Sequence, residues 1–211
     1  MSRNSKAKRD ARKKAERKPA PNTSMLEMQR SLNDLFDPKK LTSPSDINDD
    51  IRQFCLSVSP ATPFFIEVHP EPWSRQGCCD LNVKEFIKAN GGTLVCGYRI
   101  WYHFPHYIEA ERHAIWELEG KRRDISFNPD GESRVLFLPD VPERQAALEL
   151  NERRLRWGKN SKTRQLIALQ EQMESHMQIQ QMSNEEAWGT MPTFEQWQQG
   201  ARMPNLIPVI R

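Results

Sequence analysis

The feature that most constrains this chain is a series of apolar stretches at its centre, each ended by a turn. The stretches are "TLVCGYRIWYHF", "HAIWEL", "RDISF" and "RVLFLPD", rich in the β-branched and aromatic residues that favour strands. Glu119-Gly120 and "NPDGES" lie between them and have the composition of tight turns. The stretches therefore predict a sheet. Because helical patterns precede and follow it, the predicted fold class is α+β.

Helical patterns lie on both sides of these strands. "MLEMQRSLNDLF" has leucines at roughly helical spacing, and a second helix is expected to start at Ser45 or Asp46 and to reach about Cys55. "FFIEVHP" is typical of a strand. In "CCDLNVKEFIKANGG" the apolar residues share one helical face, and Gly91-Gly92 is a good C-terminal signal. This pattern predicts a helix directly before the central strands.

Composition divides the 211 residues into four parts. Residues 1–24 are predicted to be a disordered basic tail, 25–44 a short helix and linker, 45–141 the α+β core, and 142–211 a helical extension with a C-terminal tail. Helices are expected in the extension at "PERQAALELNERRLRW" and "SKTRQLIALQEQMESHMQIQQM". The Gln-rich second helix has a loose apolar stripe. Such a stripe covers the parent domain, pairs with another helix, or offers a Met-rich groove to a partner.

The net charge of +3 is unevenly distributed. Residues 1–18 contain nine Lys or Arg and two acidic residues, a net +7, which leaves −4 for the rest of the chain. Residues 3–18 can therefore make weak, non-specific contacts with nucleic acid phosphates. The tail has no aromatic side chain to stack on bases, and a solvated solubility tail is the alternative interpretation.

The sequence contains no apolar run close to the ~18 residues that a membrane span requires. The N-terminus is charged and lacks the apolar segment of a secretory signal, so a cytoplasmic location without a membrane partner is expected. The cysteines are too few and too irregularly spaced for a disulfide framework; they are Cys55, Cys78, Cys79 and Cys96. In a reducing compartment they are expected to be free thiols or ligands.

One of these cysteines lies at the start of a predicted helix. Cys79 is close to the first turn of "LNVKEFIKANGG", where the partial positive charge of the helix end favours a thiolate. The free backbone amides of that turn can also bind a developing oxyanion. Gln76 offers a side-chain donor nearby, and Asn82 is expected to brace the helix start or to contact a substrate. Cys78 is the alternative nucleophile.

A histidine and an aspartate lie on the predicted hairpin. A two-residue loop at Glu119-Gly120 makes Asp124 the diagonal neighbour of His113 on one face. A three-residue loop would move Asp124 to the opposite face. In the first register Asp124 can accept the imidazole N–H and fix the tautomer, while the other ring nitrogen faces a thiol.

A metal site is the competing interpretation of the same residue types. The candidate ligands are Cys79, Cys96, His103, His106 and His113, and His103-x-x-His106 has a chelating spacing. There is no Cys-x-x-Cys pair, and the spacing follows no zinc template. We therefore expect neither a metal nor another cofactor.

Residues 76–140 resemble a family of small uncharacterised bacterial proteins. The shared pattern is C-x-x-N-V, G-G, G-W-x-I-W, E-A-x-x-H-A-x-W, D-x-T and F-L-P-D, matched here by "CDLNV", "GG", "GYRIW", "EAERHAIW", "DIS" and "FLPD". The chain departs from it at Tyr98 and Ser126, where tryptophan and threonine are usual. It also lacks the Cys-rich tail that gives some members a zinc label. The order of cysteine, histidine and aspartate resembles the papain-like group, including transglutaminase-like domains.

The resemblance implies a papain-like or transglutaminase-like core in which a helix packs on an antiparallel sheet. It implies Cys79 as nucleophile, His113 as general base and acid, and Asp124 as the group that orients the imidazole. The expected function is a thiol-dependent acyl hydrolase or acyltransferase for amide or peptide-type bonds, with an unknown protein or peptide substrate. The alternatives are a non-catalytic binding or scaffold module that uses the basic tail or the Gln/Met-rich helix, and a small zinc-binding protein.

Overall fold

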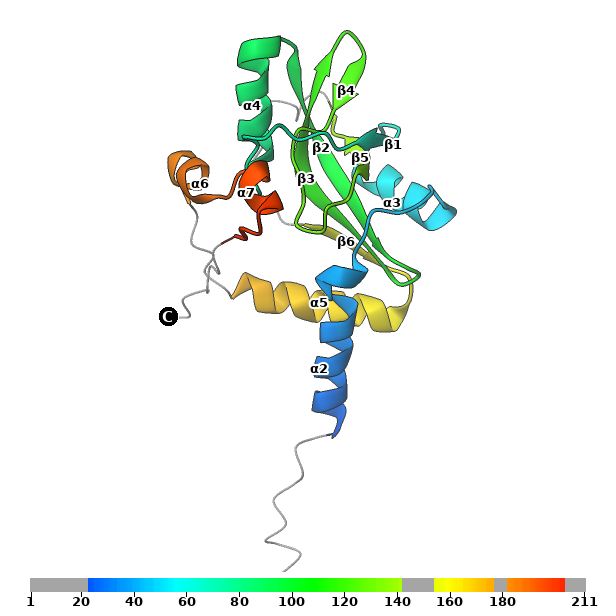
Figure 1. The fold of residues 1–211 in the computed structure, drawn as a ribbon. Helices are drawn as coiled ribbons and strands as arrows, with labels where there is room; N and C mark the ends of the chain where they lie inside the picture. Colours follow the sequence, from blue (N-terminus) through cyan, green and yellow to red (C-terminus); the bar gives the residue numbers. More distant parts are fainter. Residues whose placement is uncertain (1–22, 142–153, 177–181, 204–211) are drawn as a thin grey trace, which may run out of the picture.

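The structure is a computed structural model and describes residues 23–141, 154–176 and 182–203. Its helices are α2 (Thr23–Leu35), the short 3-10 helix η1 (Pro38–Lys40), α3 (Asp49–Val58), α4 (Cys79–Asn90), α5 (Ser161–Ser175), α6 (Asn184–Thr190) and α7 (Phe194–Gln198). Its strands are β1 (Phe64–Glu67), β2 (Thr93–His103), β3 (Tyr107–Leu118), β4 (Lys121–Arg123), β5 (Arg134–Pro139) and β6 (Leu155–Gly158). The fold class is α+β, as predicted (Figure 1). No helix in the described ranges is both long and apolar enough to cross a membrane.

The six strands form one sheet in which the paired strands run antiparallel. The order is β1-β5-β2-β3-β4, and β6 also pairs with β3. The long β2–β3 hairpin is its centre, with Thr93 opposite Glu117 and His103 opposite Tyr107. The predicted strands therefore assemble around β2 and β3, which together carry most of the residues considered below.

The β3–β4 connection has the two-residue loop that the sequence predicted. Leu118 pairs with Lys121 across it. Glu119 and Gly120 have positive φ angles of 50° and 77°, the left-handed conformation that tight hairpin loops require. This prediction is confirmed, and the register places the chain after β4 beside the middle of β3.

The sheet curls until its two edges meet. β1 and β4 lie at opposite ends of the strand order, yet Val68, just after β1, bridges Asp124, just after β4. The His69 amide donates to the Asp124 carbonyl at 2.8 Å and closes the contact. The curl gives the sheet an inner face, on which Asp124 lies, and an outer face.

Each face has its own core. On the outer face, α3 packs on the even-numbered residues of β2, β3 and β5, in a cluster of Ile51, Phe54, Cys55, Tyr98, Ile100, Tyr102, Ile108, Ala110, Leu136 and Leu138. Helix α4 covers the same face further along, where Cys79 and Val83 cluster with Ala114. The inner face holds the cluster Ile66, Ile115, Val135 and Phe137. The alternation of side chains along each strand accounts for this division.

The edge of β3 that faces away from β2 is occupied in two places. Residues Tyr107–Ala110 pair with β6, and Trp116–Leu118 pair with β4. Residues 111–115 of β3 lie between these two pairings, and on this edge they pair with no strand in the described part of the chain. Helix α5 follows β6 and packs with α2 around Tyr107, in a cluster that includes Leu35 and Ile167. His113 therefore lies at an opening between two strands.

Three predictions about individual elements are wrong. The stretch "RDISF" was expected to be a strand, but β4 ends at Arg123, so only the first residue of that stretch lies in a strand. The second helix begins at Asp49 and is capped by the Asn48 side chain, which accepts from the Ile51 amide at 3.0 Å, so neither Ser45 nor Asp46 is the cap. The extension is also not helical throughout, because Leu155–Gly158 is strand β6, a pairing with β3 that local helical propensity could not reveal. Residues 1–22, 142–153, 177–181 and 204–211, which include most of the basic tail, lie outside the described residues.

Gly97 lies opposite His113 in the β2–β3 pair, at a point where the sheet has no room for a side chain. A Cβ atom there would lie 2.3 Å from the Leu138 carbonyl oxygen and 2.5 Å from the Phe137 ring. The same ring packs edge-on against His113, with 6.3 Å between centroids. Gly97 therefore lets Phe137 reach the imidazole.

We expect Gly97→Ala to destabilise the protein by about 1–3 kcal/mol, because the methyl group overpacks a fully enclosed position. Gly189→Ala is the matched control, since nothing lies within 4 Å of its added Cβ. Chemical denaturation of the two variants measures the difference. Equal unfolding free energies would show that Phe137 can move away at no cost.

Candidate functional site

His113 and Asp124 are in contact on the inner face. The imidazole Nε2 lies 3.0 Å from Oδ2 of Asp124, and the two side chains are only 4% and 0% exposed. The Ser126 amide donates to Oδ1 of the same carboxylate at 2.9 Å. Because Nε2 is bound to the carboxylate, Nδ1 is the nitrogen left for a thiol or a substrate.

Arg99 is a third member of this cluster, and the sequence analysis did not identify it. Its Nη2 donates to Asp124 Oδ2 at 2.7 Å and to the Ser126 carbonyl at 3.0 Å. Arg99 lies two residues from Gly97, which faces His113, so strand alternation places it on the same side of the sheet. The β2–β3 register would have been the signal, but only the β3–β4 register could be predicted from turn residues.

Burial and the Arg99 charge together set the protonation states. Burial opposes ionisation of Asp124, but the charge of Arg99 and the contact with His113 outweigh it and hold the pKa of Asp124 below its ordinary value. Burial and then the Arg99 charge lower the pKa of His113, although Asp124 and Glu111 oppose this. At neutral pH the cluster therefore contains an ionised carboxylate, a guanidinium and a neutral imidazole.

Cys79 is the first residue of α4, as predicted, but its thiol is protonated in this structure. The side chain is 7% exposed and lies in the outer-face cluster with Val83 and Ala114. Burial raises the pKa of Cys79 to about 12, with the Asp80 charge as the second cause. The helix terminus therefore does not produce a thiolate here, because the loss of solvent dominates.

The structure does not join the Cys79 thiol to the His113 imidazole. The Arg99 charge lowers the pKa of the thiol and the Asp124 charge raises it. The backbone of Ala114, the residue after His113, lies beside the sulfur. Among the described residues, no hydrogen bond connects the sulfur to the His113 ring. Ala114 and His113 point to opposite faces of β3, so the thiol can approach the imidazole only around the open edge of 111–115.

Asn82 joins the segments that carry these residues. It is 0% exposed, and its Oδ1 accepts from the Arg75 amide at 2.7 Å. Its Nδ2 donates to the Arg75 carbonyl at 2.9 Å and to Ser126 Oγ at 3.2 Å. Asn82 thus connects α4, the loop before it and the segment that carries Asp124. Of its two expected roles, the geometry provides the brace.

Gln76 lies in the loop before α4 and is 4% exposed. Its backbone amide donates to the Pro192 carbonyl at 3.1 Å, whereas its buried side-chain Oε1 has no hydrogen-bond partner among the described residues. An unpartnered buried acceptor is costly, and such groups are concentrated where a ligand or a water completes the site. Gln76 therefore lies beside the start of α4 with a side-chain oxygen that can still accept a hydrogen bond.

Charged residues continue along β3 beyond His113. Glu111 accepts from Trp101 Nε1 and from Arg154, both at 2.8 Å. Glu109 is 2% exposed and pairs with Arg154 and Arg156. This ladder connects the inner face to β6. It could not be predicted from the sequence, because β6 was expected to be helix.

The candidate zinc ligands are not gathered into a site. Within the described residues, no group of three or more His, Cys, Asp and Glu side chains is placed to hold a metal ion. His103 Nδ1 lies 3.0 Å from the Leu35 carbonyl, and the rings of His103 and His106 are 6.3 Å apart. None of the four cysteines forms a disulfide in the described structure, and all four are buried.

Three comparisons with known proteins gave no match. No family model matches the chain, and neither a curated protein nor a solved structure does. What the cluster around His113 can do is therefore argued from its own geometry and chemistry.

We expect Asn82→Ala to lower the unfolding free energy by about 2–4 kcal/mol, because it removes three hydrogen bonds of a fully buried side chain and leaves the Arg75 backbone amide without its partner. Asn90→Ala on the exposed end of the same helix is the matched control, since that side chain bonds only to the Phe86 carbonyl. Chemical denaturation measures both. A loss no larger than that of Asn90→Ala would show that the loop before α4 does not depend on Asn82.

The free energy of unfolding is expected to fall as the pH is lowered from about 7 to 5.5. In this range the His113 imidazole takes up a proton in the unfolded chain but stays neutral in the folded chain. The folded pKa of His113 lies below the ordinary value of 6.5. Above about pH 6.5 the imidazole is neutral in both states, and below it only the unfolded state is protonated. Denaturation midpoints across this range measure the slope. His113→Gln should flatten it, and an unchanged slope would contradict the assignment.

Proposed function

We propose that the chain is a thiol-dependent acyl hydrolase or acyltransferase with a papain-like, transglutaminase-like core. Cys79 is the nucleophile, His113 the general base and acid, and Asp124 the orienting carboxylate. The observation that carries the proposal is the 3.0 Å contact between His113 Nε2 and Asp124, which directs Nδ1 away from the carboxylate as a proton acceptor. The order of helix, strand and following segment agrees with the resemblance described above.

The protonation states favour a general-base mechanism over a preformed ion pair. Both the thiol and the imidazole are neutral at rest, because burial disfavours the charged form of each. As Sγ attacks the carbonyl carbon, Nδ1 takes the thiol proton, and the new imidazolium is stabilised by Asp124. The proton then passes to the leaving amine and a thioester remains. Water or an amine attacks the thioester next and restores the thiol.

The start of α4 can stabilise the charge that develops on the carbonyl oxygen. No side chain caps this helix, since the N-cap position is Cys78 and it accepts no capping hydrogen bond. Backbone amides of the first turn are therefore available to an oxyanion. Gln76 lies beside them and is the side-chain donor suggested by the sequence, a role that its Nε2 rather than its acceptor Oε1 would perform.

Burial of the Cys79 thiol favours a second candidate function. A thiol that is 7% exposed with a pKa raised to about 12 is also what a structural cysteine shows. The chain would then be a non-catalytic binding module whose His113–Asp124–Arg99 cluster stabilises the curled sheet. The two candidates differ in whether the thiol can ever be uncovered and react.

We expect Cys79→Ala to abolish turnover in a screen of amide, ester and thioester substrates, a loss of at least about a thousandfold. Cys78→Ala is the matched control, because it removes the adjacent buried thiol, the alternative nucleophile, and leaves Cys79 in place, so activity should be retained. For the wild type, kcat/KM should rise with pH through a midpoint below 6.5, since the base must be neutral to accept a proton. Equal activity of wild type and Cys79→Ala, or no activity at all, would favour the binding module.

A further inference from the structure

The C-terminal described segment lies against the loop that precedes Cys79. We call residues 182–203 the strap and residues 72–78 the approach loop. The strap contains α6 and α7, which Figure 1 shows beside α4 on the side away from α3. Most of the backbone hydrogen bonds that leave the approach loop go to the strap, so the strap decides how the chain enters the nucleophile helix.

The middle of the strap pairs with the approach loop as an extended peptide. Thr193 forms an antiparallel bridge with Arg75. On one side of it the Gln76 amide donates to the Pro192 carbonyl at 3.1 Å, and on the other the Phe194 amide donates to the Ser74 carbonyl at 2.7 Å. This is the pattern by which a peptide adds to an exposed backbone edge.

Side chains add to this pairing. Met191 is 7% exposed and Pro192 is buried, so two consecutive apolar residues are enclosed at the site. The Arg75 guanidinium donates to the Met191 carbonyl at 2.9 Å. Phe194 packs on Phe127 with 5.2 Å between ring centroids. The approach loop therefore binds the backbone of Met191–Phe194, and Phe127 packs against the Phe194 ring.

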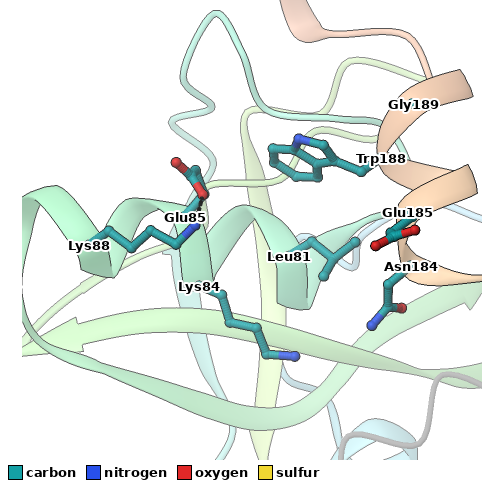
Figure 2. A pocket seen from close by; sticks show the side chains of 8 residues that line it. All are labelled: Leu81, Lys84, Glu85, Lys88, Asn184, Glu185, Trp188 and Gly189. Carbon is teal, nitrogen blue, oxygen red and sulfur yellow. Dashed lines mark hydrogen bonds and ion pairs between the residues drawn. The ribbon is translucent and has the colours of Figure 1, made fainter.

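The rest of the strap is held much less firmly. Neither α6 nor α7 contains a buried residue. A cavity of about 510 Å³ separates α6 from α4, with Leu81 and Lys84 on one wall and Trp188 on the other (Figure 2). Trp188 instead reaches the approach loop, where the Arg75 guanidinium lies 5.1 Å from its ring. The strap is thus attached through the peptide-like pairing and a few ring contacts, of Trp188 with Trp73 and of Trp197 with Phe127.

We propose that the approach loop is the binding groove for an extended polypeptide substrate and that Met191–Phe194 occupies it as an internal stand-in. The inference rests on the proposed function, because it identifies the substrate class of that site. The substrate pairs its backbone with Ser74 and Gln76 and buries two consecutive apolar side chains where Met191 and Pro192 lie. Release of the strap both frees the groove and loosens the loop that leads to Cys79, whose thiol is otherwise closed to reagents.

Phe194→Pro tests this in the full chain. Phe194 is the first residue of α7, a position that accepts proline, so the variant removes the amide bond to Ser74 and the aromatic anchor without breaking the helix. Asn184→Pro is the matched control, because it places proline at the first residue of α6, away from the groove. The probe is a fluorescent synthetic peptide with the sequence of residues 188–197, followed by anisotropy. Iodoacetamide labelling of Cys79 follows access to the thiol.

We expect Phe194→Pro to bind the peptide about tenfold more tightly than wild type and to label Cys79 about tenfold faster, as loss of one buried bond and one anchor allows. Asn184→Pro should behave as wild type in both measurements. If Phe194→Pro neither binds the peptide more tightly nor labels faster, the strap does not occupy a groove and the inference is wrong. Arg75→Met added to Phe194→Pro should abolish peptide binding, because the groove loses its donor to the peptide carbonyl. Retained binding would place the peptide elsewhere.

The peptide measurement separates this inference from the proposed function. Repeated in a Cys79→Ala background, peptide binding needs no chemistry and should be unchanged. Binding there without turnover in any Cys79 protein would leave the groove correct and the acyl chemistry wrong. Turnover that depends on Cys79 but is unaffected by Phe194→Pro or by the peptide would leave the acyl chemistry correct and the groove wrong.

Discussion

The buried carboxylate of Asp124 is the group on which the rest of the structure depends. A fully buried charge is tolerated only when partners replace its lost hydration, and Arg99, His113 and the Ser126 amide do so here. These partners come from β2, β3 and the segment after β4, so the carboxylate can be satisfied only when those strands are in one register. The backbone of the same residue also bridges Val68 and closes the curl of the sheet. The backbone of Asp124 thus closes the sheet, and its side chain places a polar cluster on the inner face.

The same interaction restricts the chemistry that the site can perform. Arg99 neutralises much of the Asp124 charge, so the carboxylate orients His113 more than it raises the pKa of the imidazole. If Cys79 reacts as proposed, a neutral imidazole accepts the proton of a neutral thiol during attack, and no reactive thiolate is stored beforehand. Such a thiol would react slowly with electrophiles that are not substrates, because the proton leaves it only during attack on a bound substrate. This property would agree with the burial of the Cys79 thiol, which is only 7% exposed.

The sequence predicted those parts of the fold that depend on local pattern. The Glu119-Gly120 loop fixed one hairpin register, and from it the approach of Asp124 to His113 followed, because strand alternation leaves no other choice. Helix α4 and its end at Gly91 were also predicted from local sequence signals. Arg99 was missed because its position depends on the β2–β3 register, which no turn residue specified. Strand β6 was missed because a polar, Arg-rich segment becomes a strand only through pairing with β3 and contact with Glu109. The contacts of the strap with the approach loop have no sequence signal at all.

The strap explains why a helix-terminal cysteine can be so well buried without a large core around it. Helix α4 begins without a side-chain cap, and the preceding loop would be free to move if only Asn82 held it. The pairing with Thr193 adds a second attachment to this loop, and in the proposed arrangement the held loop keeps solvent from the first turn of α4. Release of the strap would then restore solvent to the thiol and lower its pKa from the value that burial imposes, because desolvation is the leading cause of that shift. Access to the groove and activation of the nucleophile would be one event, since both are governed by the same few contacts.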